Sequence, residues 1–156
     1  MELLMSSFQV ACATANQPRG QFLERPASWA RWIHARTSPS ELSRWIADEA
    51  VQVVITSGGT GLTGRDGTPE AVEPLLDKTI EGFGELFRVL SFETIGTSSL
   101  QSRCLAGVAN GTVVFVLPGS LDAVETAWDR LIAAQLDATT RPCNLVQLFP
   151  RLREAP

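Results

Sequence analysis

The stretch that decides the fold runs from Val51 to Glu70 and reads VQVVIT, then SGGTGLTGRDG, then TPE. Val51–Thr56 is a β-branched, apolar run between turn signals, which is typical of a buried parallel strand. The glycine-dense residues 57–67 follow as a loop. Thr68-Pro69-Glu70 predicts the start of a helix, with threonine as N-cap, proline in the first turn and glutamate near the positive helix end.

A second unit of the same kind lies further along the chain. Thr112–Leu117 (TVVFVL) is another β-branched run. Pro118-Gly119-Ser120 then predicts a turn that leads into a helix, which continues to Gln135. Repeated strand–loop–helix units favour strands covered by helices. We therefore predict an α/β fold, a three-layer sandwich with a mostly parallel sheet covered by helices on both faces.

Three further segments have apolar residues at helical spacing. They predict a helix over Glu41–Asp48, a helix over Glu81–Ser91 and a short helix near Leu100–Gly107.

The N-terminal part has a different character, because Met1–Ser40 contains three prolines and no sustained hydrophobic period. Phe8–Ala13 could form a short strand and Ser28–Ala35 a helical turn or two. We accordingly divide the chain into an atypical segment, residues 1–40, which we expect to be disordered or truncated, and an α/β domain, residues 41–156.

Composition excludes several classes of protein. A chain of 156 residues favours a single core, and a net charge of −4 without clusters of lysine or arginine does not suit a nucleic-acid binder. No apolar run approaches the roughly 20 residues that span a bilayer, and Met1–Thr14 lacks the basic start of a secretory signal. Three distant cysteines fit neither a disulfide framework nor paired zinc ligands. We expect a reduced cytoplasmic protein without nucleic-acid or membrane partners.

The glycine-dense loop is the first candidate site. It contains Gly58, Gly59, Thr60, Gly61, Arg65 and Asp66. Ligands of open α/β sheets bind at the carboxyl ends of strands, and glycines let successive backbone N–H groups approach a phosphate. Asp66 would then hold Mg²⁺ beside the phosphates. The alternative is a tight turn in which Asp66 caps the next helix together with Thr68.

Two other segments offer phosphate-binding groups. Pro118-Gly119-Ser120 follows the second strand, although it could be an ordinary turn with Ser120 as N-cap. Ser102 offers a hydroxyl and Arg103 a guanidinium that can bind phosphate bidentately, although they could instead lie on a solvated helix face. Cys104 is interpreted as a small core residue.

These motifs resemble the molybdopterin-binding family. Gly58–Gly61, Arg65-Asp66 and Thr68-Pro69-Glu70-Ala71 match its signature GGTG…RDxTPEA, and Leu117-Pro118-Gly119-Ser120 matches its second loop. Residues 81–88, 95–98, 100–103 and 141–145 are similar to the B-type bacterial branch, which acts in molybdenum cofactor biosynthesis. The resemblance extends from about Leu42 to Leu148.

The resemblance implies a molybdopterin adenylyltransferase, a nucleotidyltransferase that moves AMP from Mg-ATP to the terminal phosphate of molybdopterin and releases pyrophosphate. Its catalytic and Mg²⁺-binding residue would be Asp66. The residues that would bind molybdopterin or nucleotide are Gly58, Gly59, Thr60, Gly61, Arg65, Thr68, Glu70, Ser102, Arg103, Pro118, Gly119 and Ser120. The family implies a homo-trimer or a dimer of trimers.

The N-terminal part departs from the family pattern. Family members carry a further carboxylate before this domain, whereas no aspartate occurs here before Asp48. An altered reading frame or start upstream of about Ser40 would explain this, as would a diverged, non-catalytic member. The alternatives to the enzyme are therefore a protein that binds molybdopterin without transferring AMP, and a fragment that cannot fold alone.

Overall fold

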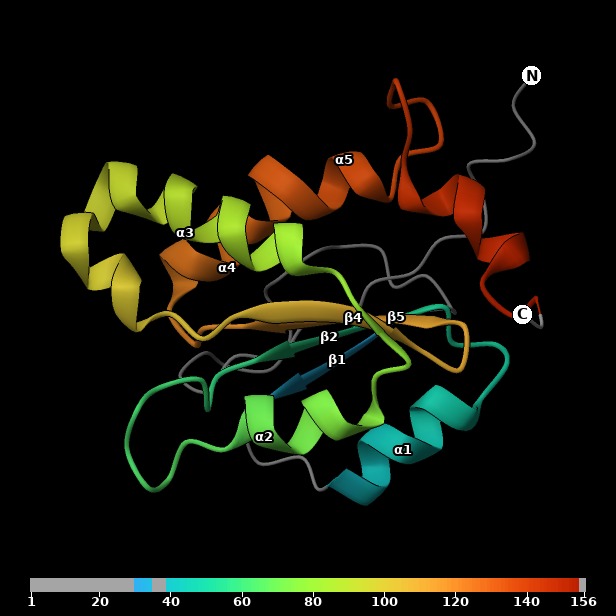
Figure 1. Cartoon of the computed structure of the whole chain (residues 1–156), viewed down its shortest axis with the longest axis horizontal. Helices are drawn as coiled ribbons and strands as arrows, with labels where there is room; N and C mark the ends of the chain where they lie inside the picture. The colour runs from blue at the N-terminus through green and yellow to red at the C-terminus, as the bar shows by residue number, and fades with distance from the viewer. Residues whose placement is uncertain (1–29, 35–38, 155–156) are drawn as a thin grey trace.

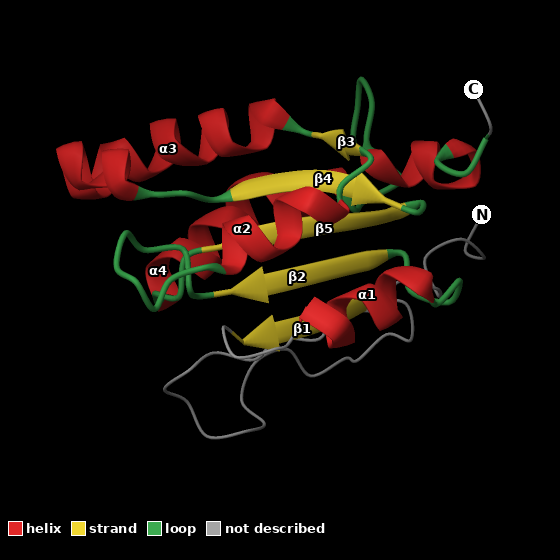
Figure 2. Ribbon diagram, turned by 60° about the horizontal axis from the view of Figure 1, so that its bottom comes forward, coloured by secondary structure: helices red, strands yellow, loops and turns green. Residues whose placement is uncertain are grey.

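The computed structural model describes residues 30–34 and 39–154, and its centre is one five-stranded mixed sheet. The spatial order of the strands is β1-β2-β5-β4-β3 (Figure 2). β1, β2 and β5 run parallel, while β4 is antiparallel to both β5 and β3. The strand bounds are β1 Ala30–His34, β2 Val53–Ser57, β3 Lys78–Thr79, β4 Leu105–Ala109 and β5 Thr112–Leu117.

Helical segments make up most of the remaining described chain. The α-helices are α1 Pro39–Ala47, α2 Thr68–Val72, α3 Glu81–Ile95, α4 Leu121–Ala127 and α5 Ala133–Gln135. The 3₁₀ turns are η1 Glu73–Leu75, η2 Gly96–Gln101 and η4 Leu145–Arg151, and a π-helical segment, η3 Trp128–Ile132, joins α4 to α5. None of the helices in the described ranges has the length and apolar character that crossing a bilayer requires.

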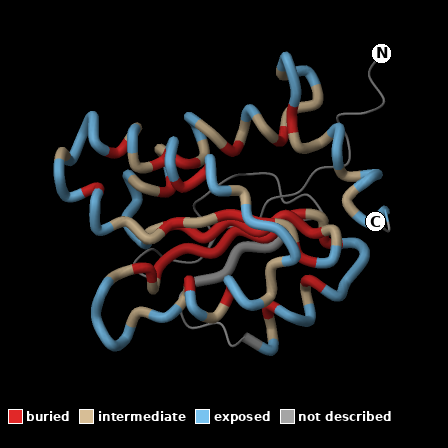
Figure 3. Tube along the Cα trace, viewed as in Figure 1, coloured by how far each residue is buried: buried red, intermediate tan, exposed pale blue. Residues whose placement is uncertain are grey.

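Helices cover both faces of the sheet, α1 and α2 on one side and α3, α4 and α5 on the other (Figure 1). Alternate residues of the central strands point to opposite faces, so each strand serves two cores. Val54 and Val114 pack with Leu42 and Ile46 of α1, whereas Val53 and Ile55 pack with α3 and α4. The central strands are accordingly the most buried part of the chain (Figure 3). Burial on both faces of the sheet explains why the strand predicted over Val51–Thr56 is rich in apolar residues instead of alternating between apolar and polar ones.

Most of the predicted elements are confirmed. The second predicted strand coincides with β5, while the first is shifted by about two residues, to Val53–Ser57. The helices predicted near residues 41–48 and 81–91 are α1 and α3. The helix predicted to reach Gln135 is formed by α4, η3 and α5 in succession.

The prediction of a mostly parallel sheet is wrong, and so is the short helix near Leu100–Gly107. Residues 105–109 form β4, which pairs antiparallel with β5. The connection is the two-residue turn Asn110-Gly111, with φ of 48° and 76°. An Asn-Gly pair is the strongest short signal for a hairpin, because both residues tolerate positive φ. The hairpin signal of Asn110-Gly111 is therefore stronger than the helical spacing of residues 100–107 that precede it.

The helical turns predicted over Ser28–Ala35 are also wrong. Residues 30–34 form β1, which pairs in parallel with β2 from Ala30↔Val53 to His34↔Ser57. Part of the atypical segment thus extends the sheet at its edge. The strand predicted over Phe8–Ala13 lies outside the described residues.

Candidate functional site

The two candidate loops begin at neighbouring strand ends. β2 and β5 are adjacent and parallel, and Ser57, the last residue of β2, is in register with Leu117, the last residue of β5. The Gly58 amide donates to the Leu117 carbonyl at 2.9 Å, and the Ser57 hydroxyl donates to the Pro118 carbonyl at 3.4 Å. The loops therefore lie side by side at one end of the sheet, where Figure 2 shows the long loop leaving β2.

Glycine is required where these loops meet. Gly58 and Gly59 have φ of 98° and 67°, a region that other residues rarely adopt. A Cβ atom on Gly119 would lie 3.1 Å from the Gly58 Cα atom, so this close approach of two backbones depends on the missing side chain. The glycines predicted from the sequence thus shape the junction, and Thr60 is buried beside it.

Asp66 is held by a residue that the sequence analysis did not select. The Thr63 hydroxyl and the Thr63 amide donate to Asp66 Oδ2 at 2.6 Å and 3.0 Å. The sequence does contain a signal for this contact, because an aspartate three residues after a threonine can form a local side-chain hydrogen bond with it or with its backbone in a turn. The predicted alternative, in which Asp66 and Thr68 cap the helix, is wrong, because Gly67 occupies the N-cap of α2 without a side-chain bond.

The environment of Asp66 favours its ionised form. Hydrogen bonds from the Thr63 side chain and amide hold the pKa of the Asp66 carboxyl below its ordinary value. Burial opposes this and is a smaller effect than the Thr63 bonds, while the Gly61 amide and the positive charge of Arg103 lower the pKa of Asp66 further by lesser amounts. Asp66 is therefore a carboxylate at neutral pH, able to face a cation or a hydrogen-bond donor.

Arg103 lies against the glycine-dense loop, not on a solvated helix face as the alternative predicted. Its Nε atom donates to the Thr60 carbonyl at 3.1 Å and its Nη2 atom to the Gly61 carbonyl at 2.6 Å. Its Nη1 atom pairs with Glu70 of α2, and this bond lowers the pKa of the Glu70 carboxyl. The edges of the guanidinium that could bind a phosphate thus contact the protein itself.

The other candidate residues differ in their contacts. The Thr68 amide donates to the Gly59 carbonyl at 3.0 Å, which ties α2 to the loop. Ser120 caps α4 by accepting from the Ala123 amide at 3.4 Å, as its alternative role predicted, and it lies exposed next to Gly119. Arg65 is exposed in the loop. The Ser102 hydroxyl is buried and makes no hydrogen bond of normal geometry.

The donor set at the junction suits a metal ion only together with a phosphate ligand. Among the residues that the structure describes, no three His, Cys, Asp or Glu side chains gather as a protein-only metal site would need. Mg²⁺ commonly uses one or two carboxylates and completes its shell with water and substrate phosphates. The ionised Asp66 provides one such carboxylate, so these residues fit an ion that arrives with a phosphorylated ligand.

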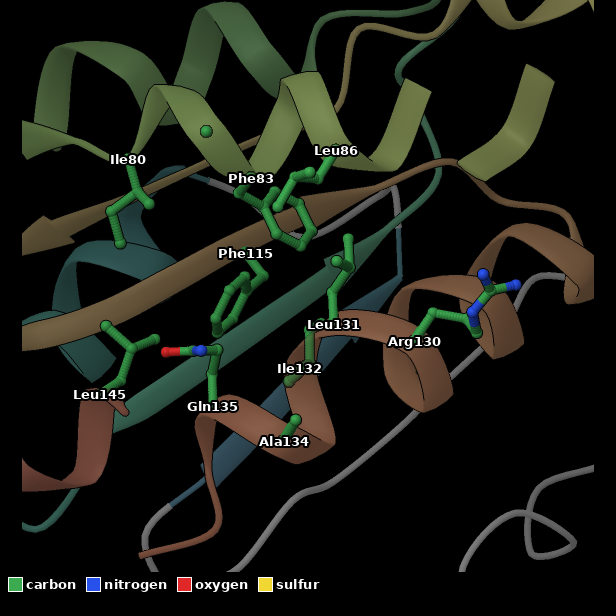
Figure 4. A pocket seen from close by; sticks show the side chains of 11 residues that line it. Ile80, Phe83, Leu86, Phe115, Arg130, Leu131, Ile132, Ala134, Gln135 and Leu145 are labelled. Atoms are coloured by element: carbon green, nitrogen blue, oxygen red, sulfur yellow. The ribbon is translucent and has the colours of Figure 1, made fainter. Parts of the chain in front are cut away.

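A hollow of about 270 Å³ lies apart from these loops, between α3 and the η3–α5 segment (Figure 4). Phe83, Phe115 and Leu131 line it together with other apolar side chains, and Arg130 is the charged residue at its edge. Cys104 is confirmed as a core residue of the same layer, 4% exposed, although it precedes a strand and lies in no helix. An apolar hollow of this kind does not suit the phosphate groups that the glycine-dense loop could bind.

Comparisons with known proteins identify a family to which the chain is similar. Residues 21–138 match a family model described as a probable molybdopterin binding domain. Molybdenum cofactor biosynthesis protein B from Escherichia coli K12 is 62% identical over 105 residues, which cover 67% of this chain and 62% of that protein. The protein of the same name from Staphylococcus aureus Mu50 is 50% identical over 99 residues, which cover 63% and 58%. The chain thus spans about three fifths of the length of these curated relatives.

Solved structures show the same likeness in three dimensions. A crystal structure of a molybdenum cofactor biosynthesis protein B has a TM-score of 0.65 and 30% identity, covering 83% of this chain and 98% of that one. A tungsten cofactor synthesizing protein from Pyrococcus furiosus has a TM-score of 0.62 and 26% identity, covering 83% and 100%.

The contact between Gly61 and Asp66 gives a testable pH dependence. A Cβ atom on Gly61 would lie 2.6 Å from Asp66 Oδ2, so Gly61→Ala must displace the carboxylate from Thr63. Because the pKa of Asp66 is lowered, its bonds from Thr63 are present at neutral pH and are lost as the pH falls through that lowered value. The Thr63 amide resonance should report this transition, and in Gly61→Ala it should move to higher pH.

Gly64→Ala is the matched control, because no atom lies within 4 Å of the added Cβ atom. It should keep the transition of the unmodified protein. Identical transitions in both variants would contradict the contact between Gly61 and Asp66.

Proposed function

The chain belongs to the family of probable molybdopterin binding domains, and from this premise we propose that it acts in molybdenum cofactor biosynthesis as a molybdopterin adenylyltransferase. The observation that carries the proposal is the junction of two glycine-containing loops at the ends of β2 and β5, together with the ionised Asp66 that Thr63 holds in the first of these loops. The names of the curated relatives, molybdenum cofactor biosynthesis protein B, support the same pathway.

The proposed reaction transfers the adenylyl group of ATP. An oxygen of the terminal phosphate of molybdopterin forms a bond to the α-phosphorus of ATP, the bond from that phosphorus to the β-phosphate oxygen breaks, and pyrophosphate leaves. Positioning and charge neutralisation are the main tasks of a protein in such a step. The backbone of Gly58–Gly61 would hold a phosphate, and the loop Pro118–Ser120 would bound the other side of the site.

Asp66 is the residue that would hold Mg²⁺ between protein and phosphates. The ion, when bound with ATP, neutralises negative charge on the phosphate oxygens. The role of the protein would be to keep the Asp66 carboxylate ionised and in a fixed orientation. Thr63 and the Gly61 amide serve this purpose, because each lowers the pKa of Asp66.

Asp66→Asn tests this role, since it removes the charge and keeps the shape of the side chain. The rate of adenylyl transfer, measured as pyrophosphate release with molybdopterin and Mg-ATP, should fall by roughly two to three orders of magnitude, as for loss of one electrostatic stabiliser. The affinity for molybdopterin should change much less. The exposed Asp129 of η3 provides the control, and Asp129→Asn should retain full activity.

The outcomes of this assay separate the enzyme from a binding protein. Unchanged transfer in Asp66→Asn would reject the role of that carboxylate. Molybdopterin binding by the unmodified chain without any pyrophosphate release would favour the alternative function, a protein that holds molybdopterin without transferring AMP.

We also propose that the protein self-associates through α3. One set of its apolar side chains is exposed, and the α3 apolar face is defined as Leu86, Val89, Phe92 and Ile95, each between 53% and 61% exposed. The opposite side, with Phe83 and Phe87, is buried against the sheet. α3 lies on the outside of the molecule (Figure 1). Contiguous exposed apolar surface marks interaction sites, and a second copy offers an identical face. Pairing of identical faces gives a two-fold contact, as between the two halves of the expected dimer of trimers.

Val89→Glu should therefore lower the oligomer mass measured by light scattering, because it places a charge in the proposed interface. Leu148→Glu is the control, since Leu148 is an exposed apolar residue of η4 and is not part of the α3 apolar face. The control should keep the mass of the unmodified protein. An unchanged mass in Val89→Glu, with a folded far-ultraviolet spectrum, would show that the α3 apolar face is not the interface.

A further inference from the structure

Arg103 contacts the two peptide groups on either side of Gly61. Its Nε atom donates to the carbonyl of Thr60, and its Nη2 atom donates to the carbonyl of Gly61 itself. The Thr60 carbonyl and the Gly61 amide belong to one trans peptide group, so they point in opposite directions. Fixing that carbonyl at Arg103 therefore fixes the direction of the Gly61 N–H on the other side.

Gly61 lies directly against Asp66. The carboxylate lies so close to Gly61 that a Cβ atom there would be 2.6 Å from Oδ2 and 2.9 Å from Cγ. The amide also helps to lower the pKa of Asp66. Arg103 and Asp66 thus contact the same short segment, Arg103 through its bonds to the Thr60 and Gly61 carbonyls and Asp66 through its close approach to Gly61.

The guanidinium is itself held in place. Glu70 of α2 pairs with Nη1, and the Arg103 side chain is only 28% exposed. A planar fork with several donors can bind two carbonyl oxygens and a carboxylate at once, which the single ammonium group of lysine cannot reproduce.

We infer that Arg103 is a positioning residue, which holds the Thr60–Gly61 peptide group and through it orients Asp66. This inference rests on the proposed function for its consequence in catalysis, but the arrangement exists without any ligand. It differs from the expectation drawn from the sequence, in which the Arg103 guanidinium binds a phosphate directly. The two roles predict opposite behaviour when a phosphate ligand is added.

The first test uses the unmodified protein and inorganic pyrophosphate with Mg²⁺. The Arg103 Nε–H resonance should exchange slowly with water before addition, because that proton is bonded to the Thr60 carbonyl. On titration with pyrophosphate, amide resonances between Gly58 and Asp66 should shift while the Arg103 Nε–H resonance stays in place. Fast exchange before addition, or a shift of the Nε–H resonance in parallel with the loop amides, would overturn the inference.

The second test uses Arg103→Lys, with Arg151→Lys as the matched control, since Arg151 pairs with Glu154 in the distant η4 region. In Arg103→Lys, hydrogen exchange of the Gly61 amide should accelerate about tenfold or more, the size expected for a lost bond to a charged donor. The kcat of adenylyl transfer should fall roughly ten- to a hundredfold, with the KM for molybdopterin nearly unchanged. The control should alter none of these values.

The readouts separate failure of the inference from failure of the proposed function. Absence of transfer in the unmodified protein would reject the proposed function, and the exchange of Gly61 would still decide the role of Arg103. A raised KM with unchanged kcat and unchanged Gly61 exchange would identify Arg103 as a phosphate ligand and overturn the inference. If Arg103→Lys does not fold, the titration of the unmodified protein decides alone.

Discussion

The register between β2 and β5 is the constraint on which the rest of the site depends. Because Ser57 pairs with Leu117, both strands end at the same level, and the chain leaves each of them through a loop that needs glycine. The backbones of Gly58 and Gly119 then approach so closely that even a methyl group on Gly119 would be crowded. A shift of the register by one residue would also turn every apolar side chain of β2 to the other face of the sheet.

Two separate cores hold this register. The residues of β2 and β5 alternate between a core formed with α1 and α2 and a core formed with α3, α4 and η3. Neither loop carries much apolar surface of its own, so the cores stabilise the strands and the strands position the loops. Arg103, Thr63 and Asp66 then form a local network that fixes the glycine-dense loop relative to α2.

The sequence predicts the parts of this structure whose signal is local. The β-branched runs of β2 and β5, and the glycines between strand and helix, identify the strands, the loops and their shared end of the sheet. The helical spacing of residues 100–107 predicts a helix where the fold has β4, although the Asn110-Gly111 pair that follows indicates a hairpin. The strand β1 could not be read from Ala30–His34, since its pairing with β2 is a long-range contact. For the same reason the sequence suggests a phosphate for Arg103, while the fold brings it to two carbonyl oxygens of a distant loop.

The central claim is that the phosphate-bearing ligand binds at the loops that follow β2 and β5. The most direct measurement is the set of backbone amide resonances that shift when molybdopterin is added to the isotopically labelled protein. The account predicts the largest shifts between Gly58 and Asp66 and at Gly119 and Ser120, with Phe83 and Leu131 unaffected. Shifts centred on Phe83 and Leu131, which line the apolar hollow between α3 and η3, would contradict it.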